Sequence, residues 1–311
     1  MLKNFHFINN KKTTLIIVGV VLLVGILSFV LRGFNLDIDF TGGYELTVDL
    51  GETTSAEIAS DIKSLIENDK ELGKDYVSSV TYSETSVKIE SKNAMSTEQQ
   101  NHLLKVICEK YANASTEVQM NNISAVIGTR TLYTTLITVA IAAVAMLIYV
   151  AFRFQFASGV AAVCCLLHDL FVMMVVYSLF QIPLSTSVIA AFLTILGYSI
   201  NATIVVFDRI RENRRKDEKT PFGEIVNTSV HETMGRSINT TVTTLLTIGA
   251  VFVACAVAVL LFPTSNLDTL RDFAGTLIVG IFAGPFSSVF LSGMIWNAIS
   301  KIGSKKDSVA E

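Results

Sequence analysis

The sequence of 311 residues carries little charge. Asp, Glu, Lys and Arg together make up 16% of the chain, whereas a typical soluble domain contains about 25%. Hydrophobic residues make up 51%, which indicates that lipid is the main solvent of this protein. The net charge of −3 gives no support for a nucleic-acid partner. The composition therefore argues against a soluble globular protein and favours a membrane protein.

Cysteine-based sites and enzyme signatures are missing as well. The four cysteines show neither the paired spacing of a metal site nor that of a disulfide framework. His231-Glu232 begins like a zinc-binding helix, but Gly235 occupies the position of the second histidine. There is no phosphate-binding loop and no Gly-x-Ser-x-Gly elbow. We therefore expect no enzyme activity, no catalytic residue, no cofactor and no metal site.

Long apolar runs are the main feature that is present. A helix needs roughly 20 apolar residues to cross about 30 Å of hydrocarbon. Six runs reach about this length, at residues 14–31, 132–152, 157–180, 185–207, 238–262 and 273–298. Lys11 and Lys12 precede the first run as in a signal peptide, but the run is too long and lacks a cleavage site. We expect the first run to remain as a membrane span.

Lys and Arg residues in the short segments beside these runs form three clusters. They precede the first run, lie between the fourth and fifth runs, and follow the sixth. With six spans all three clusters fall on one side, and Lys and Arg mark the cytoplasmic side of a membrane. The sequence thus predicts cytoplasmic termini, with the N-terminus and first span over 1–33 and a tail over 299–311. Spans two to six then occupy 126–298, with a cytoplasmic loop at about 208–235.

A polar insert over 34–125 separates the first two spans and falls on the outer side. Its first strand alternates apolar and polar residues, with the apolar positions at Tyr44, Leu46, Val48 and Leu50. Further patterns, including a capping box that starts at Ser96, predict helices over 56–67 and after Ser96, and strands over 77–82, 86–90 and 116–123. This β-α-β-β-α-β order is typical of a ferredoxin-like domain. The predicted fold class is an α-helical membrane protein of six spans with a small α+β extracytoplasmic domain.

Polar residues inside the apolar runs are the candidate functional residues, because polar groups at membrane depth are costly. His168 and Asp169 lie in the middle of the third run and form either a proton site or a hydrogen bond that packs helices. Gly197, Asn201 and Asp208 share one face of the fourth helix. Asn201 belongs either to an ion path or to a simple helix–helix hydrogen bond.

The fifth run begins with a polar stripe. Arg236, Thr240, Thr243 and Thr244 recur at three- and four-residue steps and therefore share one helical face. The stripe belongs either to an ion path or to a packing surface whose hydroxyls bond to their own helix. Arg236 can also extend its charge to the cytosolic headgroups. In the sixth run, a pair of small residues four apart is typical of helix contacts, namely Gly280 and Gly284.

Four motifs resemble those of the SecF family, the smaller membrane subunits of the bacterial SecDF protein-export complex. The first is DFTGG outside the first span, with Asp39, Phe40, Gly42 and Gly43. The second and third are LLHDL at 166–170 and RSINTTVTT at 236–244. The fourth is GYSINATIVVFDRIREN, which contains Gly197, Asn201, Asp208, Arg209, Arg211, Glu212 and Asn213. The six-span layout with one insert matches along nearly the whole chain.

This resemblance implies an RND-type transporter fold in which two six-span halves pair, with SecD as the other half. It implies an auxiliary role in the Sec translocase, beside the SecYEG channel and the SecA motor. YajC and a YidC-type insertase are further candidate partners. The exported preprotein would be captured at the outer face of the bacterial plasma membrane, and the proton gradient would promote its release.

One position departs from the family pattern. The family has an aspartate directly after the signature Asn201, where this chain has Ala202. At about 1.5 Å per residue, Asp169 lies roughly 20 Å from the cytosolic boundary and Ala202 only about 9 Å from Asp208. We therefore expect that Asp169 does not replace the missing carboxylate. The carboxylate then comes from SecD or from another ion site, or none is needed.

Other function classes remain open. One is half of an RND-like exporter for lipids or small molecules, although such exporters have larger insertions in one long chain. Another is a non-conducting scaffold for SecD, which Ala202 makes more credible. An intramembrane hydrolase comes last, because no nucleophile–base pair is visible in the sequence.

Overall fold

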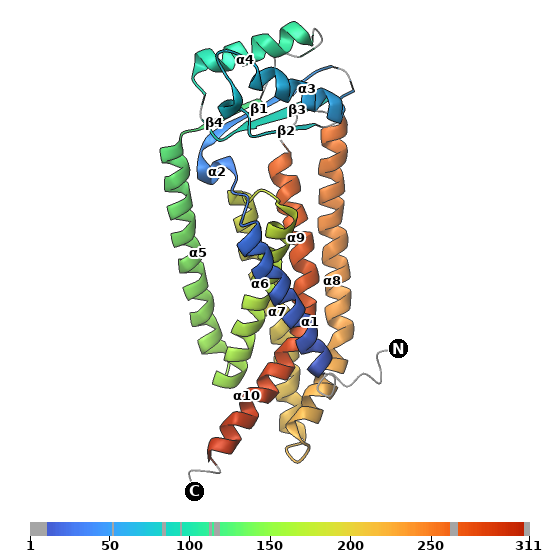
Figure 1. Cartoon of the computed structure of the whole chain (residues 1–311). Helices are drawn as coiled ribbons and strands as arrows, with labels where there is room; N and C mark the ends of the chain where they lie inside the picture. The colour runs from blue at the N-terminus through green and yellow to red at the C-terminus, as the bar shows by residue number, and fades with distance from the viewer. Residues whose placement is uncertain are drawn as a thin grey trace.

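The computed structural model places a small α+β domain at one end of a bundle of long helices (Figure 1). It describes residues 11–51, 53–82, 85–93, 95–111, 114, 119–261 and 267–307. Residues 1–10 and 308–311 of the expected cytoplasmic termini lie outside the described residues, as do residues 116–118 of the expected last strand.

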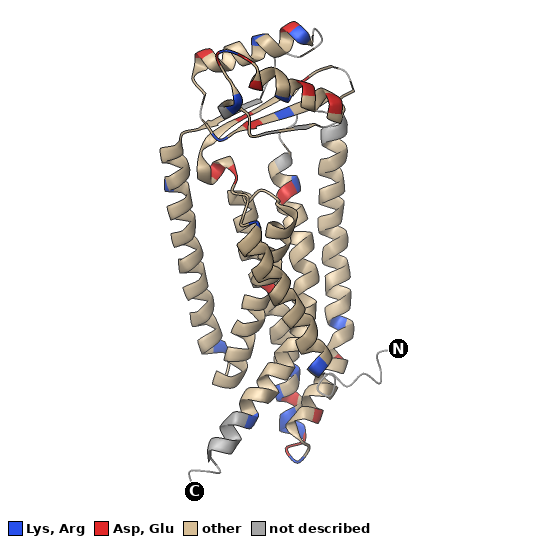
Figure 2. Cartoon of the chain, in the orientation of Figure 1, with Lys and Arg blue, Asp and Glu red and all other residues tan. Residues whose placement is uncertain are grey.

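Six helical stretches are long and apolar enough to cross a membrane, as the sequence predicts. They are α1 (Lys11–Leu31), α5 (Ala125–Arg153), α6 (Phe156–Phe180), α7 (Thr186–Lys216), α8 (Phe222–Leu261), and a last stretch of α9 (Asp268–Phe286), a π-helical segment (Ser287–Leu291) and α10 (Ser292–Asp307). Figure 2 shows that Lys, Arg, Asp and Glu gather in the domain and at the opposite end of the bundle. This distribution fits a membrane around the middle of the helices.

The domain between α1 and α5 has the expected β-α-β-β-α-β order. Its elements are α2 (Ile38–Thr41), β1 (Gly43–Asp49), α3 (Ala56–Glu67), a 3-10 turn (Lys74–Tyr76), β2 (Ser79–Tyr82), β3 (Ser86–Ser91), α4 (Thr97–Lys110) and β4 (Gln119–Ile123). The strands are antiparallel in the order β2-β3-β1-β4. Each helix therefore connects two strands that have a third strand between them, which is the split βαβ arrangement of ferredoxin-like domains.

The alternating pattern of β1 explains the core of this domain. Tyr44, Leu46 and Val48 are completely buried, because alternate side chains of a strand point to the same face. The helices α3 and α4 cover that face with Ile62, Ile66, Leu103 and Ile107. The expected capping box is also present, since the Ser96 side chain accepts from Gln99 N and the Gln99 side chain accepts from Ser96 N.

The connection between α7 and α8 differs from the expected loop over about 208–235. Helix α7 continues to Lys216 and α8 already begins at Phe222, so that only residues 217–221 connect them. This helical hairpin has an apolar core of its own, which the charged residues of the segment conceal in the sequence.

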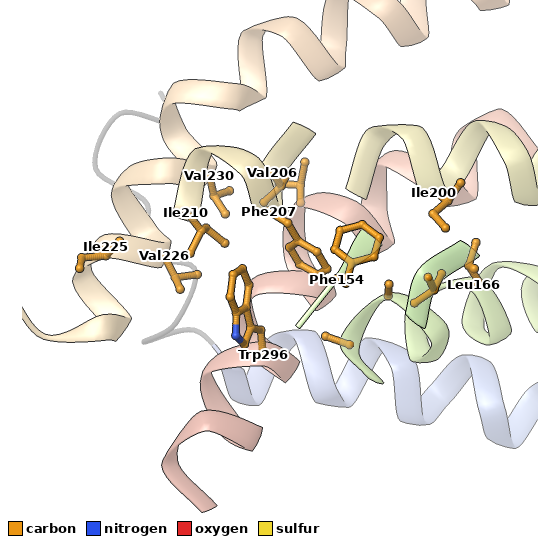
Figure 3. Packing of buried hydrophobic residues seen from close by; sticks show 14 residues of the cluster. Phe154, Leu166, Ile200, Val206, Phe207, Ile210, Ile225, Val226, Val230 and Trp296 are labelled. Carbon is orange, nitrogen blue, oxygen red and sulfur yellow. The ribbon is translucent and has the colours of Figure 1, made fainter. Parts of the chain in front are cut away.

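The core of the hairpin also anchors the end of the sixth span. Phe207 packs edge-on against Phe154, with ring centroids 5.6 Å apart, and against Trp296 of α10, at 5.0 Å. Figure 3 shows these rings beside the other buried residues, which include Ile210, Ile225, Val226 and Val230. Burial of this cluster keeps both arms of the hairpin helical beyond the membrane-spanning part of the bundle.

Candidate functional site

Asp169 is buried completely in the middle of α6. Its Oδ2 accepts hydrogen bonds from two hydroxyls on other helices, Ser199 Oγ of α7 and Ser287 Oγ of the π-helical segment, the latter at 2.7 Å. Its Oδ1 lies 3.1 Å from His168 Nδ1. The carboxyl group therefore contacts three polar side chains from three parts of the bundle.

This arrangement can hold one proton without a net charge. A charge at this depth is costly unless it is paired or hydrogen-bonded. When the proton leaves, the two hydroxyl donors still stabilise the carboxylate. The site thus has the groups that a reversible proton carrier requires.

The π-helical segment brings Ser287 to the carboxyl group. It begins two residues after Pro285, which has no backbone N–H and leaves a carbonyl of the preceding turn without its helical partner. Segments of this kind often occur at functional sites. Ser287 Oγ also lies 2.9 Å from Gly284 O, and the neighbouring Ser288 Oγ donates to the same carbonyl at 2.7 Å. Ser288 further contacts Thr203 of α7 at 3.3 Å.

Gly280 and Gly284 lie where α9 approaches α7. A Cβ atom at Gly280 would lie 2.5 Å from the Ile195 side chain, so only glycine fits there without movement of Ile195. A Cβ atom at Gly284 would be 3.5 Å from Ser199 Cβ, which is an ordinary contact. The close approach at Gly280 allows Ser199 and Ser287 to reach the same carboxyl oxygen.

The face of α7 that carries the conspicuous motif residues does not point into this site. Gly197, Asn201 and Asp208 are exposed in the chain, whereas Ser199 and Thr203 on the opposite face are buried. The structure therefore brings Asp169 together with Ser199 and leaves Asn201 uncovered.

Arg236 is exposed on α8 and forms no ion pair with any described residue. The threonine hydroxyls that follow bond back to carbonyls of α8 itself: Thr240 to Arg236 O, Thr243 to Asn239 O and Thr244 to Thr240 O. Of these three, Thr240 and Thr243 are exposed and Thr244 is half-buried. The threonine hydroxyls of the stripe therefore have hydrogen-bond partners within α8, and the Arg236 charge lies at the surface of the chain.

The expected difference in depth between Asp169 and Ala202 is wrong. Asp169 contacts Ser199, which precedes Ala202 by less than one helical turn. The two positions therefore differ by only about 5 Å along α7. The sequence-based depths were counted along each apolar run separately, from its charged end. They therefore contained no information on how α6 and α7 are placed relative to each other.

The charged end of the α7 motif ties the hairpin together. Asp208 accepts a hydrogen bond from Arg153 of α5 at 2.8 Å and lies 3.6 Å from Arg211. Around the next turn, Arg209 and Asn213 bind Glu232 of α8 at 2.6 and 2.7 Å, and Arg209 also binds Glu212 at 2.6 Å. These residues hold α5, α7 and α8 in place at this end of the bundle.

The DFTGG motif lies at the opposite end, where the domain meets the helices. Asp39 Oδ2 accepts from Thr186 N at 2.9 Å and from Thr186 Oγ1 at 2.7 Å. Phe40 is buried, and Gly42 and Gly43 have φ angles of +72° and +141° that favour glycine. The motif thus connects α2 to the beginning of α7.

Asp37 precedes this motif and caps α2, because its Oδ1 accepts from Ile38 N at 2.7 Å. Burial away from water raises the pKa of this carboxyl from 3.8 to about 6. The hydrogen bond from Ile38 opposes the rise, and the nearby charge of Asp39 adds to it.

The comparisons with known proteins point to one family. The family model described as "Protein export membrane protein SecD/SecF, C-terminal" matches residues 104–302. The chain belongs to the SecD/SecF family of protein-export membrane proteins. It is therefore a SecF-type subunit of the protein translocase, a transport protein and not an enzyme, and a multi-pass protein of the bacterial membrane.

Individual relatives agree with this family. The protein translocase subunit SecF of Sebaldella termitidis is 36% identical, over 87% of this chain and 84% of that protein. The subunit SecDF of Bacillus subtilis is 30% identical, over 98% of this chain but 40% of that protein. The crystal structure of SecDF from Thermus thermophilus matches 96% of this chain and 39% of that one, with a TM-score of 0.75 and 31% identity. The SecF chain thus spans about two fifths of the SecDF proteins.

Sequence reasoning missed four residues of these sites. Ser199 lies within the α7 motif but on the face opposite to Asn201, so it was not a candidate. Ser287 gives no signal of its own, because Ser288 and Ser292 lie in the same apolar run, although Pro285 nearby points to an irregular helix. Thr186 lies between two other hydroxyl residues at the start of α7, and its partner Asp39 is far away in the chain. Asp37 could have been recognised as a helix cap, but its burial follows only from the packing of the domain on the bundle.

We predict that Asp37→Asn stabilises the protein in a pH-dependent way. Folding raises the pKa of this acid, so the folded chain holds its proton more tightly than the unfolded chain. Its contribution is therefore most favourable below about pH 4 and is lost as the pH rises through about 6. Asparagine keeps the helix cap without a charge. The variant should gain roughly 2 kcal/mol at pH 8 and almost nothing at pH 4.

The measurement is the melting temperature of both purified proteins in detergent between pH 4 and pH 8. The expected difference between them grows with pH. An equal difference at both ends of this range would show that the charge of Asp37 costs no stability.

Proposed function

We propose that this SecF subunit pairs with SecD and uses the proton gradient to promote the late translocation and release of exported proteins. The family membership supports the role in export. The Asp169 site supports the use of protons, because a buried carboxyl with an imidazole and two hydroxyls can bind and release a proton. The SecYEG channel and SecA would supply the emerging chain, and YajC and a YidC-type insertase are further candidate partners.

In this proposal Asp169 takes the role that Ala202 cannot fill. The two positions are less than one turn apart in depth, so that Asp169 carries a carboxyl at a comparable level of the membrane. The hydrogen bonds from Ser199 and Ser287 couple the charge of Asp169 to α7 and to the π-helical segment. A change of charge would therefore alter contacts between three helices.

We propose that both termini and the α7–α8 hairpin are cytoplasmic and that the domain is extracytoplasmic. The support is the position of Arg214, Arg215, Lys216 and Lys219 at the tip of the hairpin, because Lys and Arg mark the cytoplasmic side. The domain lies at the opposite end of the helices (Figure 1).

Cysteine labelling of sealed cells tests this orientation. In a chain whose native cysteines are replaced by alanine, Ser60→Cys on the exposed side of α3 should react with an impermeant maleimide from outside. Lys216→Cys should react only after the membrane is opened. Labelling of Lys216→Cys in sealed cells would reverse the orientation.

The exposed polar face of α7 and α8 is the proposed contact with SecD. Asn201 and Arg236 are exposed in the single chain, and polar groups are costly in contact with lipid. Few residues in the apolar stretches of α5 and α8 are buried in the single chain, whereas nearly half of those in α6 are. The SecDF relatives, in which one chain is about two and a half times longer, support the pairing.

A pair of glycine variants separates a SecD contact from a lipid-facing surface. A Cβ atom at Gly197 on α7 or at Gly249 on α8 meets nothing within 4 Å in this chain. Gly197→Leu should reduce copurification of SecD by at least about tenfold, because the added side chain separates the paired helices. Gly249→Leu, away from the polar stripe, should pair normally. Equal copurification with both variants would place the SecD contact elsewhere.

Substitutions around Asp169 test the proton site itself. Asp169→Asn keeps the shape and the hydroxyl contacts but cannot bind a proton, so gradient-driven export should fall to the level seen without a gradient. Ser199→Ala and Ser287→Ala each remove a hydrogen bond to the charged form. Such a bond is worth about 1.5–3 kcal/mol, so export should fall at least about tenfold.

Ser288→Ala is the matched control, since Ser288 Oγ binds Gly284 O and Thr203 but not Asp169. It should remain within about twofold of the wild type. All variants are measured for preprotein translocation into inverted vesicles with and without a proton gradient, at equal copurified SecD. Normal gradient-driven export by Asp169→Asn would leave the second candidate, a scaffold for SecD without a proton cycle, which the absence of a carboxyl at Ala202 favours.

A further inference from the structure

The short helix α2 is the place where the domain meets two of the spans. It links α1 to β1, and its backbone lies directly against the first turn of α5. A Cβ atom at Gly42 would be 2.6 Å from Ala125 Cα, and one at Gly128 would be 2.4 Å from Gly42 N. No side chain fits between α2 and α5 at these two glycines. The contact between the two helices is therefore formed by backbone atoms.

Asp39 fastens the same short helix to α7. Its carboxylate receives both the backbone N–H and the hydroxyl of Thr186, the first residue of α7. The first turn of α7 contains no acidic residue of its own. Because the first N–H groups of a helix lack partners and form the positive end of its dipole, Asp39 supplies the negative charge that this end of α7 lacks.

Backbone hydrogen bonds reinforce this link. Leu184 N donates to Asn35 O at 2.8 Å, and Asp37 N donates to Leu184 O at 3.0 Å. They form a short parallel bridge between Leu36 and Leu184. Ser178 Oγ, near the end of α6, also donates to Gly33 O at 2.7 Å. The segment from Gly33 to Asp39 is therefore hydrogen-bonded at several points to the α6–α7 connection and the end of α6.

Helix α7 connects this link with the membrane interior. Ser199, which binds Asp169, lies about 20 Å along the helix from Thr186. We propose that α2 is a joint that converts movement of α7 into rotation of the domain against α5, with the Asp39–Thr186 contact as its link. This inference rests on the proposed function, in which the charge state of Asp169 moves α7.

A double-mutant cycle tests the link in the vesicle assay with SecD, SecYEG and SecA. Asp39→Ala should reduce gradient-driven export about fivefold, the scale of a lost helix cap. Thr186→Val should reduce it less, because its backbone N–H still donates. The double variant should be no worse than Asp39→Ala alone. Asp39→Asn should retain most of the activity, because the amide oxygen accepts the same two hydrogen bonds.

Two matched controls share the chemistry but not the position. Asp49→Ala removes a carboxylate that accepts from Gly51 N inside the domain, and Thr194→Val removes a hydroxyl that bonds to Ala190 O on α7. Both should export normally. The joint is contradicted if Asp39→Ala exports as well as Asp49→Ala, or if the effects of Asp39→Ala and Thr186→Val multiply in the double variant.

A covalent replacement of the link separates coupling from folding. In a chain without the native cysteines, Asp39→Cys combined with Thr186→Cys should export poorly when reduced and recover when oxidised to a disulfide. A verified disulfide that leaves export low would overturn the joint. Asp169→Asn in the same assay judges the proton site independently: if it fails while Asp39→Ala is normal, the joint is wrong and the proposed function stands.

Discussion

A carboxyl group at membrane depth must find hydrogen-bond donors, and the way in which Asp169 finds them determines how three helices are arranged. The donors come from Ser199 on α7 and from Ser287 in the π-helical segment after α9, while His168 stands at the other oxygen. A buried charge without these partners would cost several kcal/mol. Gly280 permits the close approach of α9 to α7 that brings both hydroxyls to one oxygen. The hydrogen bonds to Asp169 therefore depend on the apolar packing of α9 against α7.

Helix α7 contacts other elements at both of its ends as well as at Asp169. At one end Asp208 and Arg209 bind α5 and α8, and Phe207 packs against Trp296. At the other end Thr186 binds Asp39 of the domain. The signature sequence of α7 thus combines a buried face that touches Asp169, an exposed face available to a partner, and two ends fixed to other elements.

Most of the architecture could be predicted from the sequence, because it depends on periodicity and local signals. The six spans follow from run length, and the ferredoxin-like domain follows from the alternation along β1 and the capping box at Ser96. The helical structure within residues 208–235 could not be predicted, because the buried partner of these helices, Trp296, lies far along the chain. Asp169 could be singled out as an ionisable residue in an apolar run. Its contacts with Ser199 and Ser287, and the contact of Asp39 with Thr186, depend on helix packing that a single sequence does not contain.

The central claim is that Asp169 binds and releases a proton inside the bundle of this SecF subunit. Infrared difference spectroscopy of the complex with SecD, recorded between acidic and alkaline pH, measures this directly through the carbonyl band of a protonated carboxyl group. The account predicts a band that is present in the wild type and in Ser288→Ala and absent in Asp169→Asn. Identical difference spectra for the wild type and Asp169→Asn would contradict it.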